Sequence, residues 1–292
     1  MDRIKIYDDI GIGDIRANPH PLLLEPLLER LKVENKRKAE KKENNSSVRM
    51  QLRDALVCVS RHLAGKDFER ARDAVIEGMF GEHSEAWHAA RLTVHFPSNE
   101  TADWLVEALN ESPIARGEVI SSLGMVASQL KSGKQLEIID SLKPFATNNE
   151  HIAHWRRTMR AIGALGHPKG LRFLISNFRN LNPDVREAVY DGIGEHFGSL
   201  TEQEMLDSIR VLAESNAHTN HKLDVISTIM HSSVVEPGHK SRSAIQSPQV
   251  RKQLLRLVEP IARSRRNGVR NGDLSPYDIE RAKNAVELLK RH

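Results

Sequence analysis

Apolar residues recur along most of the chain with the three-and-four spacing of amphipathic helices. One such stripe consists of Leu52, Ala55, Leu56, Val59 and Leu63. Residues spaced in this way lie on one face of an α-helix. Polar or Gly- and Pro-containing turns separate the stripes into pairs, and no alternating strand pattern competes with them. The sequence therefore predicts an all-α protein.

The predicted helices repeat at a nearly constant interval. Residues 113–124 and 183–194 carry proline, arginine, valine and glycine at the same offsets, and residues 155–166 supply a third copy. Second helices of successive pairs are predicted to begin near residues 98, 133, 168 and 201. A fixed repeat of this length is typical of stacked helical pairs. We expect a right-handed α-solenoid of about six pairs, with a capping helix at each end.

The chain is predicted to divide at residue 46, with the solenoid occupying residues 47–292 and its portion 240–292 being basic. The segment 1–46 contains a leucine-rich stretch that continues into the charged residues 32–43. We expect a helix whose first half docks and whose second half is solvated or frayed. Two roles stay open for it: a cap on the first repeat, or a tethered peptide that docks on a partner or on a second copy.

Residues 183–194 resemble the first helix of HEAT repeats, and residues 166–181 resemble the following turn and second helix. The resemblance implies that Arg116 and Arg186 link one repeat to the next. It also implies a convex face of first helices and a concave face of second helices. Because HEAT arrays are most often binding scaffolds, it favours a non-catalytic adaptor that binds a partner protein.

Acidic residues gather on the predicted second helices. The residues expected to bind the partner protein are Asp103, Glu107, Glu137, Asp140, Glu204 and Asp207. No catalytic residue, metal or other cofactor is predicted, so we expect that the protein is not an enzyme.

A basic segment supports an alternative function, nucleic-acid binding. Residues 251–270 contain seven cationic side chains and one acidic side chain, Glu259. The net positive charge of this segment is therefore larger than the net charge of +4 of the whole chain. The candidate phosphate-binding residues are Arg251, Lys252, Arg256, Arg263, Arg265, Arg266 and Arg270. A solvated surface or an acidic protein partner would explain the same composition.

Two enzymatic alternatives have weaker support. The chain has 14 histidines, and deoxyhypusine hydroxylases are HEAT-like iron enzymes, but their His-Glu pairs are absent here. Solvated or helix-capping histidines are expected instead. Helical-repeat DNA glycosylases use tryptophans and an acid in a basic groove, which Trp104, Asp103 and Trp87 or Trp155 could imitate. Acidic second helices would repel phosphate, so core packing is expected for the tryptophans.

Composition excludes several broad classes. The chain of 292 residues has no apolar run as long as the roughly 18 residues of a membrane span, and its first residues do not form a secretory signal. Its one cysteine, Cys58, cannot form an internal disulfide and is expected to be buried. These features favour a cytoplasmic protein without a membrane partner.

Overall fold

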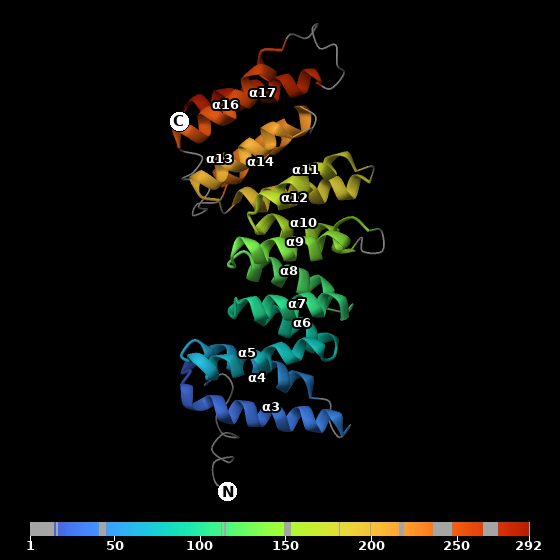
Figure 1. The fold of residues 1–292 in the computed structure, drawn as a ribbon, viewed down its shortest axis with the longest axis vertical. Helices are drawn as coiled ribbons and strands as arrows, with labels where there is room; N and C mark the ends of the chain where they lie inside the picture. Colours follow the sequence, from blue (N-terminus) through green and yellow to red (C-terminus); the bar gives the residue numbers. More distant parts are fainter. Residues whose placement is uncertain are drawn as a thin grey trace. The chain divides into compact units, whose positions relative to one another are not determined.

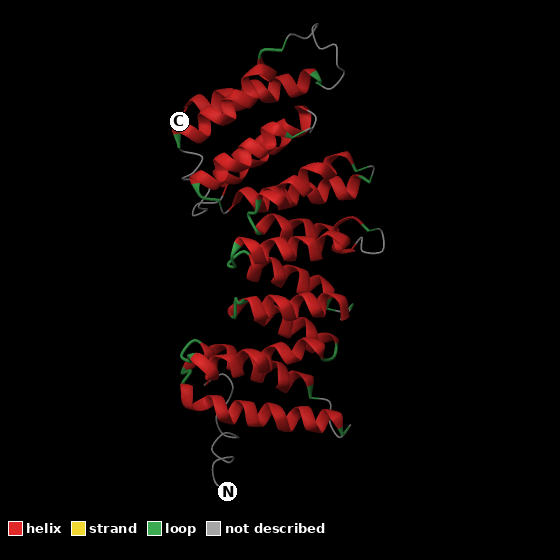
Figure 2. Cartoon of the chain, viewed as in Figure 1, coloured by secondary structure: helices red, strands yellow, loops and turns green. Residues whose placement is uncertain are grey.

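The computed structural model describes most of the chain. The described residues are 15, 17–40, 45–111, 113, 115–148, 153–180, 182–198, 200–215, 219–235, 247–264 and 274–291. All regular secondary structure in these residues is helical, which confirms the predicted all-α class (Figure 2). The chain divides into two compact units, Met1–Leu130 and Lys131–His292.

The first unit consists of α-helices with short 3-10 turns between them (Figure 1). Its elements are η1 (Pro21–Leu23), α3 (Leu24–Ala39), α4 (Ser46–Ser60), α5 (Gly65–Ile76), η2 (Glu77–Phe80), α6 (His83–Leu92), η3 (Thr93–His95), α7 (Asn99–Glu111) and α8 (Arg116–Ala127). Helix α4 packs against α3, α5 and α6, and α8 packs against α6 and α7. Each of these helices therefore buries its apolar stripe against neighbouring helices.

Helix α3 belongs to the hydrophobic core of the first unit. Leu24, Leu27 and Leu31 are buried in the same cluster as Leu52 and Leu56 of α4. The charged half of α3 is mostly exposed, as expected, but it is not frayed: it continues as regular helix to Ala39, and one of its residues, Glu34, is buried. Arg30 and Arg37 both form ion pairs with Glu34, so the buried carboxylate is compensated.

The second unit is also built from helices that pack on their neighbours (Figure 1). Its elements are α9 (Ser132–Thr147), α10 (Trp155–Ala164), α11 (Pro168–Ser176), η5 (Asn177–Arg179), α12 (Pro183–Gly198), α13 (Glu202–Glu214), α14 (Thr219–Val235), α16 (Pro248–Ala262) and α17 (Pro276–Arg291). Helix α12 packs against α10 and α14, while α16 packs against α13 and α17.

The predicted starts of the second helices are confirmed to within a residue. They correspond to the first residues of α7, α9, α11 and α13, namely Asn99, Ser132, Pro168 and Glu202. Side chains fix some of these starts by binding free backbone N–H groups. Nδ1 of His167 accepts a hydrogen bond from the N–H of Lys169, at 3.1 Å. Thr201 and Glu204 form a reciprocal capping box on α13.

Both arginines singled out by the HEAT resemblance bind the segment that precedes their own helix. Nε of Arg116 donates to the carbonyl of Leu109, at 3.1 Å. Nη1 of Arg186 donates to the carbonyl of Asn180, at 2.7 Å. Each contact links the start of a first helix to the end of the element before it. The relationship to HEAT repeats itself stays a prediction.

Three expectations about burial need correction. Trp155 is buried and its indole N–H donates to the carbonyl of Asn148, but Trp87 and Trp104 are exposed, each by 40%. Cys58 is partly exposed, because it lies at the edge of the buried stripe of α4. His196, expected to be solvated or capping like the other histidines, is completely buried on α12 and lies 2.9 Å from the hydroxyl of Ser208.

Candidate functional site

The six predicted protein-binding acids lie on three second helices. Asp103 and Glu107 belong to α7 in the first unit, Glu137 and Asp140 to α9, and Glu204 and Asp207 to α13, in the second unit. All of them are exposed except Asp207, which is partly exposed. The surroundings of these acids differ from helix to helix.

In the second unit the acids of α9 are paired with lysines. Asp140 accepts hydrogen bonds from Lys143, at 2.7 Å, and from Lys169 of α11, at 3.0 Å. These two bonds hold the pKa of Asp140 below its ordinary value. Glu137 forms an ion pair with Lys134, at 2.7 Å. The surface of α9 therefore has balanced charge rather than an excess of negative charge.

The acids of α13 serve local structure. Glu204 accepts from the backbone N–H of Thr201, at 2.8 Å, as part of the capping box. Asp207 forms an ion pair with Arg210, at 3.4 Å. Glu204 therefore binds the cap of α13 and Asp207 binds a cation of the same helix. Both carboxylates stabilise α13 itself.

Helix α7 differs from α9 and α13 in charge. It carries Glu100, Asp103, Glu107 and Glu111 and has no lysine, arginine or histidine. Residues three or four positions apart are neighbours on a helix surface. The exposed Trp104 therefore lies among these carboxylates, next to Asp103, four residues after Glu100 and three before Glu107. Among the helices of the first unit, α7 has the largest excess of acidic over basic residues.

Trp104 is paired with a second exposed aromatic side chain. Phe80, the last residue of η2, is 41% exposed and Trp104 is 40% exposed. The centroids of the two rings lie 5.9 Å apart, and their planes are 70° apart. This edge-to-face geometry is favourable for aromatic pairs. We call Phe80, Asp103, Trp104 and Glu107 the α7 surface.

A buried charged cluster holds η2, and with it Phe80, in place. Arg49 and Arg53 lie one turn apart on α4, and both bind Glu85 in the first turn of α6. All three residues are at most 2% exposed. Arg53 also donates to the carbonyl of Ala74 near the end of α5, at 3.2 Å. The cluster therefore joins α4, α5 and α6 around the turn that carries Phe80.

Gly78 allows this cluster to form. A Cβ atom at position 78 would lie 2.5 Å from Nε of Arg53 and 2.8 Å from Cβ of Ala89. Both separations are shorter than real Cβ contacts, so η2 can lie against the Arg53 guanidinium only with glycine at this position. Phe80 follows two residues later, so its position depends on the buried cluster.

The charges in the cluster stabilise one another. Burial raises the pKa of Glu85, but hydrogen bonds and charge attraction from Arg49 and Arg53 outweigh it and hold the pKa below its ordinary value. Burial lowers the pKa of Arg53, and Glu85 opposes that shift. Lys38 of α3 also donates to Glu85, at 3.2 Å. A buried carboxylate with three cationic partners has a structural role rather than a catalytic one.

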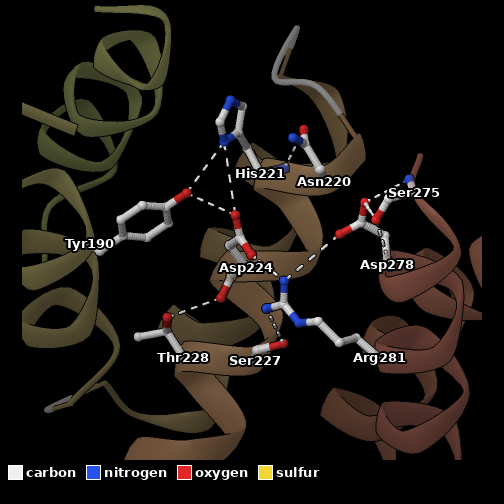
Figure 3. Close-up of polar contacts among 9 residues, drawn as sticks. All are labelled: Tyr190, Asn220, His221, Asp224, Ser227, Thr228, Ser275, Asp278 and Arg281. Atoms are coloured by element: carbon white, nitrogen blue, oxygen red, sulfur yellow. Dashed lines mark hydrogen bonds and ion pairs between the residues drawn. The ribbon is translucent and has the colours of Figure 1, made fainter. Parts of the chain in front are cut away.

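A second polar cluster links three helices of the second unit (Figure 3). The hydroxyl of Tyr190 on α12 donates to Oδ2 of Asp224 on α14, at 2.8 Å. Nη1 of Arg281 on α17 binds Oδ1 of Asp224, at 2.6 Å, and Nη2 binds the hydroxyl of Ser227, at 3.1 Å. Nδ1 of His221 on α14 also lies 3.4 Å from the Tyr190 hydroxyl.

The contents of this cluster resemble catalytic groups, but its geometry favours a structural role. Burial raises the pKa of Tyr190, and the hydrogen bond to Asp224 raises it further. The phenol therefore stays protonated and acts as a donor rather than as a nucleophile. Both carboxylate oxygens of Asp224 already accept hydrogen bonds. Asp224 consequently joins α12 to α17 through α14.

The basic segment predicted to bind nucleic acid is described in part. Lys252, Arg256 and Arg263 are exposed on or just after α16, and Arg251 is partly exposed. Arg263 and Lys290 both pair with Glu259. The remaining candidates, Arg265, Arg266 and Arg270, lie outside the described residues. Of the predicted set, Lys252 and Arg256 form the pair of exposed cations one turn apart on one helix.

The described part of the chain contains neither a candidate metal site nor a candidate membrane span. Among those residues, no three His, Cys, Asp or Glu side chains are placed to hold a metal ion. His151 and His218, each three residues from another histidine, lie outside the described residues. No described helix combines the length and apolar character needed to cross a bilayer.

Comparisons with known proteins do not identify the chain. No family model matches it, and no curated protein matches it. Among solved structures it is similar to an engineered protein whose crystal structure was determined by the Northeast Structural Genomics Consortium. The sequence identity is 14% and the TM-score 0.34, over 81% of this chain and 96% of that one. A likeness this distant defines neither a family nor a function.

The exposure of Trp104 could have been predicted from the sequence. The buried apolar residues of α7 are Ala102, Leu105, Ala108 and Leu109, and this spacing leaves Trp104 outside the buried stripe. Phe80 gave no such signal, because its exposure follows from the position of η2. The buried Arg49, Arg53 and Glu85 were also missed, since charged residues on amphipathic helices are ordinarily solvated.

Proposed function

We propose that the protein is a non-catalytic helical-repeat scaffold that binds a partner protein, and that the α7 surface is its docking site. The observation that carries the proposal is the exposed Phe80–Trp104 pair among the carboxylates of α7. Exposed aromatic residues are enriched in protein interfaces, where tryptophan is a frequent hot spot. The resemblance to HEAT repeats favours the same class of function.

The preference for α7 over the other predicted acids follows from charge. Asp140 and Glu137 are paired with lysines, and Glu204 and Asp207 are engaged on α13. Only Asp103 and Glu107, of the six predicted acids, lie on a helix that carries no cation. The exposed Phe80–Trp104 pair, which includes a residue of α7, supports the choice of this helix among the three.

Trp104→Ser and Phe80→Ser test the proposal against a matched control. Trp87 on α6 is also 40% exposed, but it lies outside the α7 surface. Circular dichroism would first establish that the variants have the helix content of the wild type. Mass spectrometry would then compare the proteins that bind to the immobilised wild type and to immobilised Trp104→Ser, Phe80→Ser and Trp87→Ser. We expect a protein bound by the wild type and by Trp87→Ser to be lost from the other two. Equal capture by Trp104→Ser would contradict the proposal.

A second candidate function is nucleic-acid binding through α16. Lys252 and Arg256 are exposed one turn apart, while Glu259 on the same helix is occupied by Arg263 and Lys290. If about five cations of the basic segment met phosphates, affinity would fall roughly 500-fold between 50 and 200 mM salt. Such a footprint would bind nucleic acid without reading its sequence.

Gel shifts with a duplex DNA and a single-stranded RNA, at several salt concentrations, test this second function. The double variant Lys252→Gln with Arg256→Gln is expected to lower the salt slope by about 2 if both side chains meet phosphates. Lys32→Gln with Lys66→Gln removes the same charge from exposed positions of the first unit and serves as control. Binding that is absent at 50 mM salt, or unchanged in the first variant, would exclude the function.

A further inference from the structure

We propose that His167 and His196 form an acid-sensitive switch, which releases α11 from α9 and α13 from α12 when the two imidazoles take up protons. Both residues and the groups that they bind belong to the second unit, so the switch does not depend on the α7 surface. The hydrogen bonds of the two rings, the burial of His196 and the charges around both rings carry the proposal.

His167 connects the starts of two helices in its neutral form. Its Nδ1 accepts from the N–H of Lys169, at 3.1 Å, and so caps α11. A ring nitrogen that accepts such a bond carries no proton, so the proton of the neutral ring lies on Nε2. Nε2 lies 3.0 Å from the hydroxyl of Ser132, the first residue of α9, and donates to it. One neutral imidazole therefore caps α11 and joins it to α9.

Protonation of His167 removes this cap. An imidazolium carries a hydrogen on each nitrogen, so Nδ1 would point a hydrogen at the N–H of Lys169. A positive charge at the first turn of a helix is also unfavourable, because the helix N-terminus carries partial positive charge. Burial lowers the pKa of His167, and the charge of Lys169 lowers it further. The carboxylate of Asp140 on α9 binds the ammonium of Lys169, at 3.0 Å.

His196 connects α12 to α13, and it too is held in its neutral form. Its ring is completely buried, with Nε2 2.9 Å from the hydroxyl of Ser208 on α13. Among the described residues, Nδ1 of His196 has no hydrogen-bond partner. An imidazolium at this place would bury a positive charge with one of its two N–H groups unpaired, which is costly in a protein interior.

The groups around His196 do not compensate for a proton on its ring. Burial lowers the pKa of His196 to about 4. The backbone of Gly163 and the carboxylate of Glu204 on α13 favour the charged form but do not outweigh burial, and a charge on His167 disfavours it. Since a proton on either ring disfavours a proton on the other, both rings gain when the helices separate and water reaches them.

Acid therefore favours the open state. A ring in contact with water has its ordinary pKa of 6.5, so opening at His196 takes up a proton below that pH and none well above it. With pKa values of about 4 closed and 6.5 open, the equilibrium constant for opening rises about 25-fold between pH 7.5 and pH 5. Opening at His167 changes in the same direction, because the pKa of that ring is also lowered in the closed state.

Hydrogen exchange of the full chain at pH 7.5 and pH 5 tests the switch. Mass spectrometry would give protection factors, which divide out the pH dependence of the intrinsic exchange rate, for α11, α13 and α17. Helix α17 belongs to the same unit and serves as internal reference. We expect protection in α13 to fall about 25-fold at pH 5 and protection at the start of α11 to fall as well. Protection in α17 should stay within about twofold.

Two conservative variants assign the effect to the two rings. His167→Asn keeps a capping acceptor at the start of α11, and His196→Gln keeps a hydrogen-bonding group near Ser208, but neither new side chain titrates. We expect His167→Asn to remove the pH dependence at α11 and His196→Gln to remove it at α13. His62→Gln changes an exposed histidine of the first unit and should behave as the wild type.

Unchanged protection in α11 and α13 between the two pH values would overturn the inference. An equal loss of protection in α17 would overturn it as well, because that pattern indicates unfolding of the whole unit. The same holds for a pH dependence that persists in both variants. Circular dichroism at pH 7.5 shows whether each variant folds. Should His196→Gln not fold, the exchange pattern of the wild type and of His167→Asn decides by the same criteria.

Discussion

Gly163 of α10 and Gly192 of α12 meet backbone to backbone. A Cβ atom on Gly163 would overlap the carbonyl group of Gly192, and one on Gly192 would lie 2.5 Å from the carbonyl oxygen of Met159. Main-chain atoms cannot rotate away as a flexible side chain would, so these two helices can approach this closely only at glycines. The contact sets the spacing of α10 and α12 within the second unit.

Gly192→Ala should destabilise the protein strongly. Overpacking of a close contact costs about 1–3 kcal/mol, and this loss exceeds the gain of about 0.5–1 kcal/mol that alanine brings to a helix. Gly194→Ala is the matched control, since its Cβ would lie 3.7 Å from Cγ2 of Thr228, an ordinary contact. Urea denaturation should show a clear loss of unfolding free energy for Gly192→Ala and none for Gly194→Ala. Equal stabilities of the two variants would contradict the observed packing.

Glu85→Ala should be among the most destabilising single substitutions in the first unit. It leaves Arg49 and Arg53 buried without their carboxylate, and breaking a buried ion pair in this way costs about 3–5 kcal/mol. Glu82, three residues earlier and exposed, provides the control: Glu82→Ala should change stability by less than about 1 kcal/mol. Thermal unfolding followed by circular dichroism measures both. A Glu85→Ala protein as stable as Glu82→Ala would show that the cluster does not hold the unit together.

The periodic part of the fold could be predicted from the sequence because it depends on local spacing. The starts of α7, α9, α11 and α13 follow from recurring turn residues and apolar stripes, which each helix carries in its own sequence. The burial of Arg53 could not be predicted in this way. It depends on Glu85 and Gly78, which lie on other elements and approach Arg53 only after α4, α5 and α6 have packed.

The acidic residues of the α7 surface could be predicted from the sequence, but the exposed aromatic pair between Phe80 and Trp104 could not. Asp103 and Glu107 were identified by charge, whereas Trp104 was assigned to the core by its residue type. Large aromatic residues are usually buried at least in part, so the residue type favoured the core, whereas the buried positions of α7 leave position 104 on the exposed side. The pairing of Asp140 with Lys169 could not be predicted, because the two residues lie on different helices.

Arg281→Met should weaken the attachment of α17 to α14. The guanidinium of Arg281 contacts Asp224 and Ser227, and all three side chains are partly buried (Figure 3). Methionine keeps most of the apolar contact area but removes the charge and the hydrogen-bond donors. We therefore expect the free energy of unfolding to fall by roughly 1–3 kcal/mol. Double-mutant cycles with Asp224→Asn should give a coupling energy of about 1 kcal/mol or more. Lys283→Met, exposed on the same helix, is the control, and additive effects of Arg281→Met and Asp224→Asn would contradict the linkage.

Stability should fall in mild acid because of His196. Burial lowers the pKa of this fully buried imidazole to about 4 in the folded protein. In the unfolded chain the pKa returns to about 6.5, so below that pH the unfolded state binds more protons and is favoured. With these two values the contribution of His196 to stability falls by about 2 kcal/mol between pH 7.5 and pH 5.

His196→Gln isolates this effect, because glutamine keeps a hydrogen-bonding group near the hydroxyl of Ser208 but does not titrate. The free energy of unfolding, measured by urea denaturation at pH 7.5 and pH 5, should fall by about 2 kcal/mol more in the wild type than in this variant. His62→Gln, which changes an exposed histidine of the first unit, should follow the wild type. A pH dependence that is the same in wild type and His196→Gln would show that the buried imidazole is not the group that titrates.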